Sequence, residues 1–237
     1  MGLSRDTKIT WLGHATFLVH TPGDKRILID PFLEHNPKCP AEFKSIDICD
    51  LILLTHAHSD HISDALPVAE RTGAPIVAIV ELAGWLRSKG GANVIEMNKG
   101  GNVRFGEINV TMVNAFHTSS IEDGDKTFYG GEPAGYVVRL ENGFTFYHAG
   151  DTCVFGDMAL IGELYAPELA MIPIGDYYTM GPKEAAKAVR LLRVKHVLPM
   201  HYGTFPVLTG TPDELRELTR DVEGLTVHSP SPGESID

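Results

Sequence analysis

The sequence contains little cysteine and no long apolar run, and each shortage excludes a class of protein. Its three cysteines, Cys39, Cys49 and Cys153, are odd in number and show no CxxC spacing, which argues against a framework of disulfides. No stretch approaches the ~20 apolar residues of a membrane span, and the opening MGLSRD lacks the charged-then-apolar pattern of a signal peptide. We therefore expect a cytoplasmic protein without a membrane partner.

Basic residues are scarce as well. The chain has 20 Lys and Arg against 31 Asp and Glu, so its formal net charge is -11. This balance offers no general attraction for nucleic acid or anionic membrane, although it does not exclude a local cationic pocket. We expect a small molecule, rather than a nucleic acid, as the binding partner.

Only two short stretches, at 121–133 and 229–233, have a linker-like sequence. The first is embedded among strand-like segments and the second is interpreted as a tail, so we expect residues 1–237 to form a single domain. With 237 residues, 43% of them hydrophobic, the chain can bury one sizeable core. The apolar segment 205–208 can belong to that core or to an interface between identical copies, so a homo-oligomer stays open.

Alternating apolar runs and turn residues predict an α/β protein. The uninterrupted apolar run at 50–55 is typical of a strand buried on both faces, and Asn142 with Gly143 marks a hairpin because both residues tolerate positive φ. Further strands are expected at 8–11, 16–20, 26–29, 76–80, 94–97, 103–105, 108–114, 135–140, 144–148, 169–174, 197–200 and 225–227, and helices at 63–71, 82–89, 157–164, 182–192 and 213–219. Hairpins interspersed with crossover helices predict two mixed β-sheets packed face to face, with helices outside.

The segment LILLTHAHSDH, residues 51–61, places three histidines and an aspartate directly after a buried strand. His56 and His58 are two residues apart, so an extended chain sends both imidazoles to one side. Asp60 and His61 follow where the chain turns into a helix, and they can reach a neighbouring metal ion. Imidazole and carboxylate suit Zn²⁺, Mn²⁺ or Fe. A solvated histidine-rich turn is the alternative, but four such residues at a buried strand's carboxyl end favour a metal site.

Three further candidate ligands follow other predicted strands. His117 comes after the strand at 108–114, Asp151 after the second strand of the hairpin, and His201 after the strand at 197–200. Each alone would be an ordinary polar loop residue. Because all three stand at the carboxyl ends of strands, they can converge on one edge of a sheet sandwich.

These residues carry a family resemblance over essentially the whole chain. THAHSDH resembles the HxHxDH signature of the metallo-β-lactamase superfamily, and the three later candidates follow its order. WLGHATFLVH and ILIDPFL resemble the opening of the L-ascorbate-6-phosphate lactonases and of their uncharacterised metal-dependent hydrolase relatives; N-acyl-phosphatidylethanolamine phospholipase D shares a similar opening. PIGDYYTMGPKEAAKA and VLPMHYGTFP resemble the uncharacterised branch more closely still. The resemblance implies the metallo-β-lactamase fold, a four-layer αββα sandwich.

The same resemblance implies a ligand set for two divalent metal ions, with Zn²⁺ expected and Mn²⁺ or Fe as alternatives. It assigns His56, His58 and His117 to the first ion, Asp60, His61 and His201 to the second, and Asp151 to a bridge between them. It also matches Asp30, in LIDP, to the family's structural aspartate, which hydrogen-bonds the backbone of the ligand loop rather than the metal.

Two adjacent cations predict hydrolysis by a hydroxide held between them, with Asp60 orienting the nucleophile. The expected substrate is a small, anionic ester, lactone or phosphoester. Asp151 or a metal-bound water can protonate the leaving group, and the sequence does not choose between them.

Three other functions can be compared with this hydrolase. A phosphodiesterase or nuclease acting on nucleic acid would need a basic surface or an added domain. A di-iron oxygen or nitric oxide reductase of this family would carry glutamate in place of His58. A non-catalytic metal-binding regulator is disfavoured because a structural metal site typically holds a single ion that is fully enclosed by its protein ligands.

Other residues near the ligands have open roles. His14, in the tight GHA segment, can contact substrate, support a ligand or make a structural hydrogen bond. His148 stands three residues before Asp151, so strand parity predicts that it points into the core, and Cys153 is expected to be a small buried residue.

Two segments are expected to form walls of the pocket. Residues 118–133, rich in Gly, Asp and Ser, directly follow a candidate ligand and are predicted to be a mobile wall. The segment GDYYTMG, residues 175–181, is the second, with Tyr177 and Tyr178 able to stack on a substrate or donate a hydrogen bond.

Overall fold

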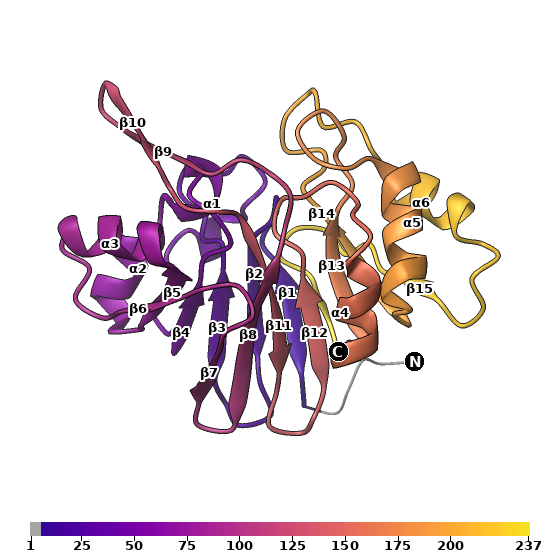
Figure 1. Cartoon of the computed structure of the whole chain (residues 1–237), viewed down its shortest axis with the longest axis horizontal. Coiled ribbons are helices and arrows are strands. Elements are labelled where there is room, and N and C mark those ends of the chain that lie inside the picture. The colour runs from indigo at the N-terminus through magenta and orange to yellow at the C-terminus, as the bar shows by residue number, and fades with distance from the viewer. Residues whose placement is uncertain (1–5) are drawn as a thin grey trace.

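The computed structural model describes residues 6–237, and within them two seven-stranded β-sheets pack face to face (Figure 1). The first sheet contains β1 (Lys8–Trp11), β2 (Phe17–His20), β3 (Arg26–Ile29), β4 (Leu51–Leu53), β5 (Ile76–Ile79), β6 (Val94–Met97) and β16 (Ser235–Ile236). The second contains β7 (Asn102–Phe105), β8 (Ile108–Asn114), β11 (Ala134–Arg139), β12 (Thr145–His148), β13 (Leu169–Pro173), β14 (His196–Met200) and β15 (Thr226–Val227).

Both sheets are mixed, as predicted. The first has the order β16-β1-β2-β3-β4-β5-β6, in which β3 to β6 run parallel and the remaining pairs are antiparallel. The second has the order β15-β14-β13-β12-β11-β8-β7, in which β12 to β15 run parallel. The parallel strands β4 and β5 are buried throughout, which explains their unbroken apolar sequences LIL and IVAI.

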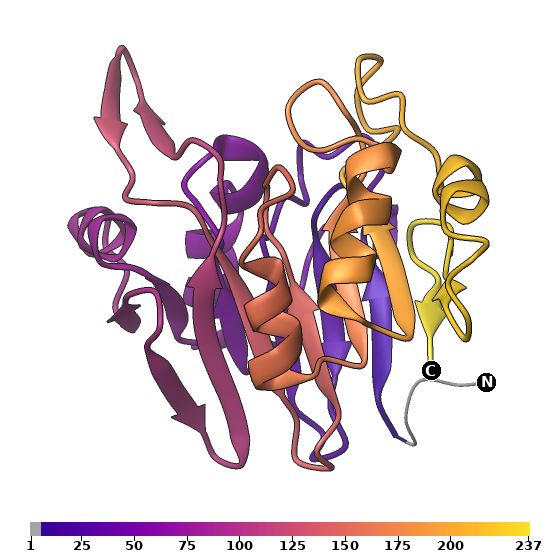
Figure 2. The same ribbon diagram turned by 45° about the vertical axis from the view of Figure 1, so that its right-hand side comes forward.

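Helices cover the outer faces of the two sheets and complete the predicted four layers (Figures 1 and 2). The helices of the described residues are α1 (Ser59–Ile62), α2 (Ala65–Thr72), α3 (Val80–Ser88), α4 (Met158–Tyr165), α5 (Pro182–Leu192) and α6 (Pro212–Leu218), with a short 3₁₀ helix at Ala41–Phe43. The single turn α1 lies at the ends of the strands rather than on an outer face (Figure 1). Helix α3 packs on β5 and β6, whereas α5 packs on β13. Within residues 6–237, no helix combines the length and the apolar character needed to cross a bilayer.

One hydrophobic cluster joins the inner faces of the sheets, with Phe17 and Ile29 of the first sheet and Phe146 of the second fully buried in it. The Tyr136 hydroxyl of β11 crosses between the sheets and donates to the carbonyl of Leu54, 2.8 Å away. These contacts hold the end of β4, where the histidine-rich segment begins, against the second sheet.

Two strand pairings were not predicted from the sequence. Residues 118–133 contain a hairpin of β9 (Ser120–Asp123) and β10 (Lys126–Tyr129), which projects beyond the two sheets (Figures 1 and 2). All four residues of β10 are exposed, so the alternation of apolar and polar residues that marks a half-buried strand is absent. The expected tail also ends in β16, which pairs with β1 and forms the edge of the first sheet.

Candidate metal centre

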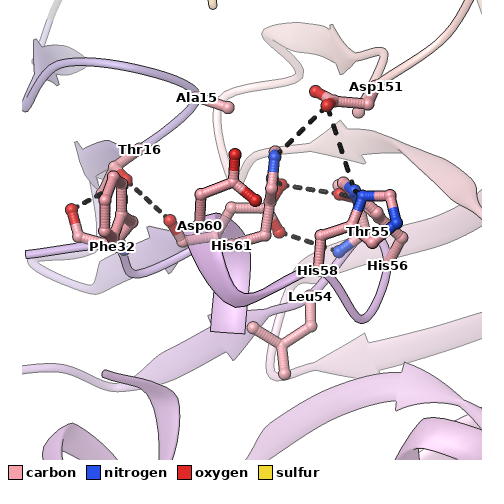
Figure 3. Close-up of polar contacts among 12 residues, drawn as sticks. Ala15, Thr16, Phe32, Leu54, Thr55, His56, His58, Asp60, His61 and Asp151 are labelled. Atoms are coloured by element: carbon pink, nitrogen blue, oxygen red, sulfur yellow. Dashed lines mark hydrogen bonds and ion pairs between the residues drawn. The ribbon is translucent and has the colours of Figure 1, made fainter. Parts of the chain in front are cut away.

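The loop after β4 carries four of the predicted ligands because the chain stays extended until α1 begins. His58 is the last extended residue before α1, which starts at Ser59, so Asp60 and His61 lie on the first turn of that helix. His56 and His61 are buried, and the side chain of Asp60 is partly exposed. Figure 3 shows this segment facing the carboxylate of Asp151.

Asp30 holds this loop from behind, in the role that the family resemblance implied. Its Oδ1 accepts the backbone N–H of Thr55 at 2.8 Å, and its Oδ2 accepts the Thr55 hydroxyl at 2.6 Å and His61 Nδ1–H at 2.8 Å. Both carboxylate oxygens are therefore occupied, so Asp30 supports the loop and is not available as a ligand.

These hydrogen bonds also decide which ring nitrogens can bind a metal. The Thr55 hydroxyl has one hydrogen and gives it to Asp30, so at 3.0 Å it can only accept from His56 Nδ1–H. His61 likewise uses Nδ1–H on Asp30. In the neutral form, both histidines then present an Nε2 lone pair to the centre, which is the tautomer that a metal ligand needs.

Asp151 lies where ligands from both sheets meet. Its Oδ2 has four histidine Nε2 atoms around it, at 3.0 Å for His201, 3.4 Å for His61, 3.6 Å for His117 and 3.9 Å for His56. His117, Asp151 and His201 follow β8, β12 and β14, three strands that run in the same direction, so they converge at one edge of the second sheet.

Three groups of donor atoms are close enough to hold a metal ion, and one of them, Asp30 with His56 and His61, contains a carboxylate that is already occupied. Two groups remain. One consists of His56, His58 and His117, and the other of Asp60, His61, His201 and His14; within each group the candidate atoms lie within 4.8 Å of one another. Apart from the addition of His14, the structure brings together the two sets that the family resemblance implied.

The chemistry of these donors fits divalent transition metals. His61 Nε2 and Asp151 Oδ1 are buried and have no hydrogen-bond partner among the described residues, a costly arrangement unless something else binds them. Burial lowers the pKa values of His56, His58 and His117. These imidazoles are therefore neutral near pH 7, which is the state that binds Zn²⁺, Mn²⁺ or Fe.

Asp151 and His61 are charged in the metal-free protein. Burial raises the pKa of Asp151, but the neighbouring His201 and His61 outweigh it and hold that pKa well below its usual range. Burial lowers the pKa of His61, and Asp151 and Asp30 together raise it well above its usual range. A metal bound at His61 Nε2 would replace the proton that otherwise neutralises this acidic surrounding.

His14 supports a ligand and does not reach the cavity. Its ring is buried, with Nε2 3.0 Å from Asp60 Oδ2 and Nδ1 3.1 Å from the Thr204 hydroxyl. Burial first, and then His201, lower the pKa of His14 to about 4, so the ring is neutral and donates Nε2–H to Asp60. Its carbonyl also accepts the backbone N–H of His201 at 3.0 Å. Sequence reasoning missed Thr204, because no local pattern connects it to residue 14.

A cavity of about 620 Å³ opens onto the ligands. Tyr178 lines it, as expected, whereas Tyr177 does not and packs its ring against Tyr178, with centroids 4.7 Å apart. Of the expected wall at 118–133, only Thr118 reaches this cavity. His35, which the sequence gave no reason to select, also lines it.

The predictions for His148 and Cys153 had opposite outcomes. His148 is fully buried, with Nε2 3.1 Å from the Ala15 carbonyl and Nδ1 accepting from Gly150 N–H, which confirms its prediction as a core residue. Cys153 was predicted to be buried, and this is wrong: it is exposed. The chain turns outward after Asp151, because Cys153 N–H bonds the Phe116 carbonyl on a neighbouring loop at the surface.

The chain is similar to a known protein family and to known metal-dependent hydrolases. The family model of the Beta-lactamase superfamily domain matches residues 25–202. The chain is similar to a UPF0173 metal-dependent hydrolase of Rubrobacter xylanophilus, 56% identical over 232 residues that cover 97% of this chain and 96% of the relative. A relative of the same description from Methanosarcina mazei is 48% identical over 231 residues, or 98% of each chain.

A solved structure is also similar over the whole length. Igni18, a metallo hydrolase from the hyperthermophilic archaeon Ignicoccus hospitalis, is 38% identical with a TM-score of 0.84, and the match covers 97% of each chain. The likeness confirms the predicted sandwich fold.

Proposed function

Because the chain belongs to the beta-lactamase superfamily and, within it, to the UPF0173 metal-dependent hydrolases, we propose that it holds two divalent metal ions and hydrolyses a small ester, lactone or phosphoester. Zn²⁺ is the proposed metal, with Mn²⁺ or Fe as alternatives, since all three suit histidine and carboxylate ligands. The proposed setting is the cytoplasm and the proposed partner a small molecule.

One observation carries the proposal: a single carboxylate oxygen of Asp151 lies within 3.9 Å of four histidine nitrogens from two ligand groups. A carboxylate in this position suits a bridge between two ions. We assign His56, His58 and His117 to one ion and Asp60, His61 and His201 to the other.

The residues around this centre have separable tasks. When bound, two metals would supply an acidified water as nucleophile and polarise the group under attack. Asp60 lines the cavity and keeps its carboxylate fixed by His14, so it can accept a hydrogen bond from water and orient it. His14 and His61 outweigh burial and lower the pKa of Asp60, which keeps it an acceptor near neutral pH. The proton for the leaving group would come from a metal-bound water, because the pKa of Asp151 lies well below its usual range and its carboxylate carries no proton near neutral pH.

The regulator alternative is less well supported because the donor groups are not closed off. Structural zinc sites are enclosed tetrahedra, whereas here His58, His117 and His201 all line an open cavity of substrate size.

The experiment compares lactones with phosphodiesters on metal-reconstituted protein, with metal content measured in parallel. We expect two metals per chain and turnover of one substrate class. Asp60→Ala should lose turnover, whereas Asp213→Ala, which removes an exposed carboxylate on α6, should keep it. Two bound metals without turnover of either class would favour the regulator, and no metal binding would contradict the proposal.

A further inference from the structure

The walls of the cavity beside the metal centre are apolar and aromatic. Phe32, Tyr178, Phe205 and Val207 line it. Phe32 is buried, whereas Tyr178 and Val207 are exposed and form an accessible part of the wall. Side chains of this kind favour an apolar ligand group, since binding removes apolar surface from water on both partners.

No lysine or arginine lines this cavity among the described residues. The polar side chains beside the ligands are the uncharged Ser59, Ser63 and Thr118, together with His35. Hydroxyl groups can bind a carbonyl or an ether oxygen, but they do not balance a buried carboxylate or phosphate. A ligand anion held here, away from the metals, would lose hydration without gaining a counter-charge.

Lys44, in the segment between β3 and β4, is already engaged. Lys44 Nζ donates to the backbone carbonyls of Leu33, Glu34 and Asn36, at 3.1, 2.5 and 3.2 Å. These three bonds use all the donors of an ammonium group. Turning Lys44 toward the cavity would break all three of these bonds, so it is not a reserve anion binder.

The negative electrostatic field of the whole protein also disfavours an anionic group on the ligand. The chain carries a formal net charge of -11, and Asp60 and Asp151 contribute carboxylates at the cavity itself. Bound metals can offset charge on the group under attack, but a second anion farther along the substrate would meet only the apolar wall and the protein's overall negative field.

We infer that the site, given the proposed hydrolase function, selects substrates whose portion remote from the scissile bond is uncharged and apolar. The lining that carries this inference is Phe32, Tyr178, Phe205 and Val207, with no lysine or arginine among the described residues beside them. It differs from the substrate expected from the sequence, which was anionic. That expectation came from the two adjacent cations, whereas the residues of the wall are spread from position 32 to position 207.

The direct test is binding, which does not depend on turnover. Benzohydroxamate and its para-carboxy analogue share a metal-chelating head and differ only by a charge on the far side. Calorimetry on metal-loaded protein should show benzohydroxamate binding about tenfold tighter or more, equivalent to ~1.4 kcal/mol. Equal affinities, tighter binding of the carboxylated analogue, or no binding of either would overturn the inference.

A charge added to the wall should change this preference. Val207→Arg places a guanidinium at the cavity and should narrow the difference to less than about threefold or reverse it. Val80→Arg is the matched control, because Val80 is equally exposed at 41% but lies on α3 and does not line the cavity. An unchanged preference in Val207→Arg, or an equal change in both variants, would contradict the role of the wall.

Turnover separates this inference from the hydrolase proposal. Two pairs of substrates are compared, one of γ-lactones and one of para-nitrophenyl phosphodiesters. In each pair, one member has an alkyl tail and the other has the same tail ending in a carboxylate. Faster kcat/KM for the alkyl member supports both proposals, whereas equal rates overturn the selectivity and leave the hydrolase proposal standing. No turnover, combined with the expected hydroxamate preference, contradicts the hydrolase proposal and supports the selectivity of the cavity.

Discussion

The imidazole of His14 lies 3.0 Å from the carboxylate of Asp60, and its backbone carbonyl accepts the N–H of His201. One residue near the N-terminus thus touches two proposed ligands of the same metal ion, from different sheets. Residues that orient ligands in this way affect metal affinity and activity by ~10–100-fold when removed.

We therefore predict that His14→Ala lowers kcat/KM and the affinity for one metal by ~10–100-fold. The measurement is steady-state turnover together with metal titration. His20→Ala is the matched control, because His20 forms the same kind of pair with Asp24, at 2.7 Å, on the exposed surface. Equal effects of the two variants would show that His14 does not position Asp60.

Asp30→Ala should destabilise the metal-free protein. It removes the acceptor for three buried donors, on Thr55 and His61, and a buried unpaired group costs ~1–3 kcal/mol. We expect a loss of about 3 kcal/mol or more in urea unfolding. Asp24→Ala is a control for backbone strain, because Asp24 and Asp30 both have positive φ, 58° and 47°. A similar loss in both would assign the effect to the backbone.

Gly175→Ala should disturb the ligand His201 through its backbone. A Cβ at residue 175 would overlap the carbonyl oxygen of His201, which cannot move without moving the ligand. We expect ~1–3 kcal/mol of destabilisation and weaker binding of one metal. Gly156→Ala meets nothing within 4 Å and serves as the control. The prediction would be contradicted by unchanged metal affinity and unchanged thermal unfolding in Gly175→Ala.

His228 should make the protein sensitive to acid at a site away from the metal centre. Burial, and then the neighbouring His196, lower the pKa of His228 to about 4 from 6.5. On acidification the unfolded chain takes up this proton before the folded one, so stability present above pH 6.5 is lost as the pH falls toward 4.

The test is urea unfolding of wild type and His228→Gln between pH 7 and 4. Other buried histidines contribute to the acid sensitivity of both proteins, so the difference between the two curves isolates residue 228. We expect wild type to lose more stability than the variant over this range. Parallel curves would contradict the assignment.

The ligand segment and the fold were predictable because both follow from patterns among residues that are close together in the sequence. Apolar runs identify the buried strands, and the segment after β4 carries His56, His58, Asp60 and His61 within six positions. His117 and His201 could be added because they follow strands, whose carboxyl ends meet at one sheet edge. Thr204 and the cavity wall at Phe205 and Val207 could not, since their place depends on contacts between distant loops.

Departures from the sequence expectation also have physical causes. The hairpin β9–β10 lacks an alternating pattern because β10 has no buried face. The strand β16 is only two residues long and is defined by pairing with β1, at the far end of the chain. Cys153 is exposed because the direction of the chain after Asp151 is set by a bond to the loop at Phe116. None of these is visible from neighbouring residues alone.

The central claim is that Asp151 lies between two metal ions, and anomalous diffraction from crystals of the metal-loaded protein tests it most directly. The account predicts two peaks at the metal's absorption edge, ~3.5–4 Å apart as in other two-metal sites, one beside His56, His58 and His117 and the other beside Asp60, His61 and His201, with the Asp151 carboxylate between them. A single peak, or peaks away from Asp151, would contradict it.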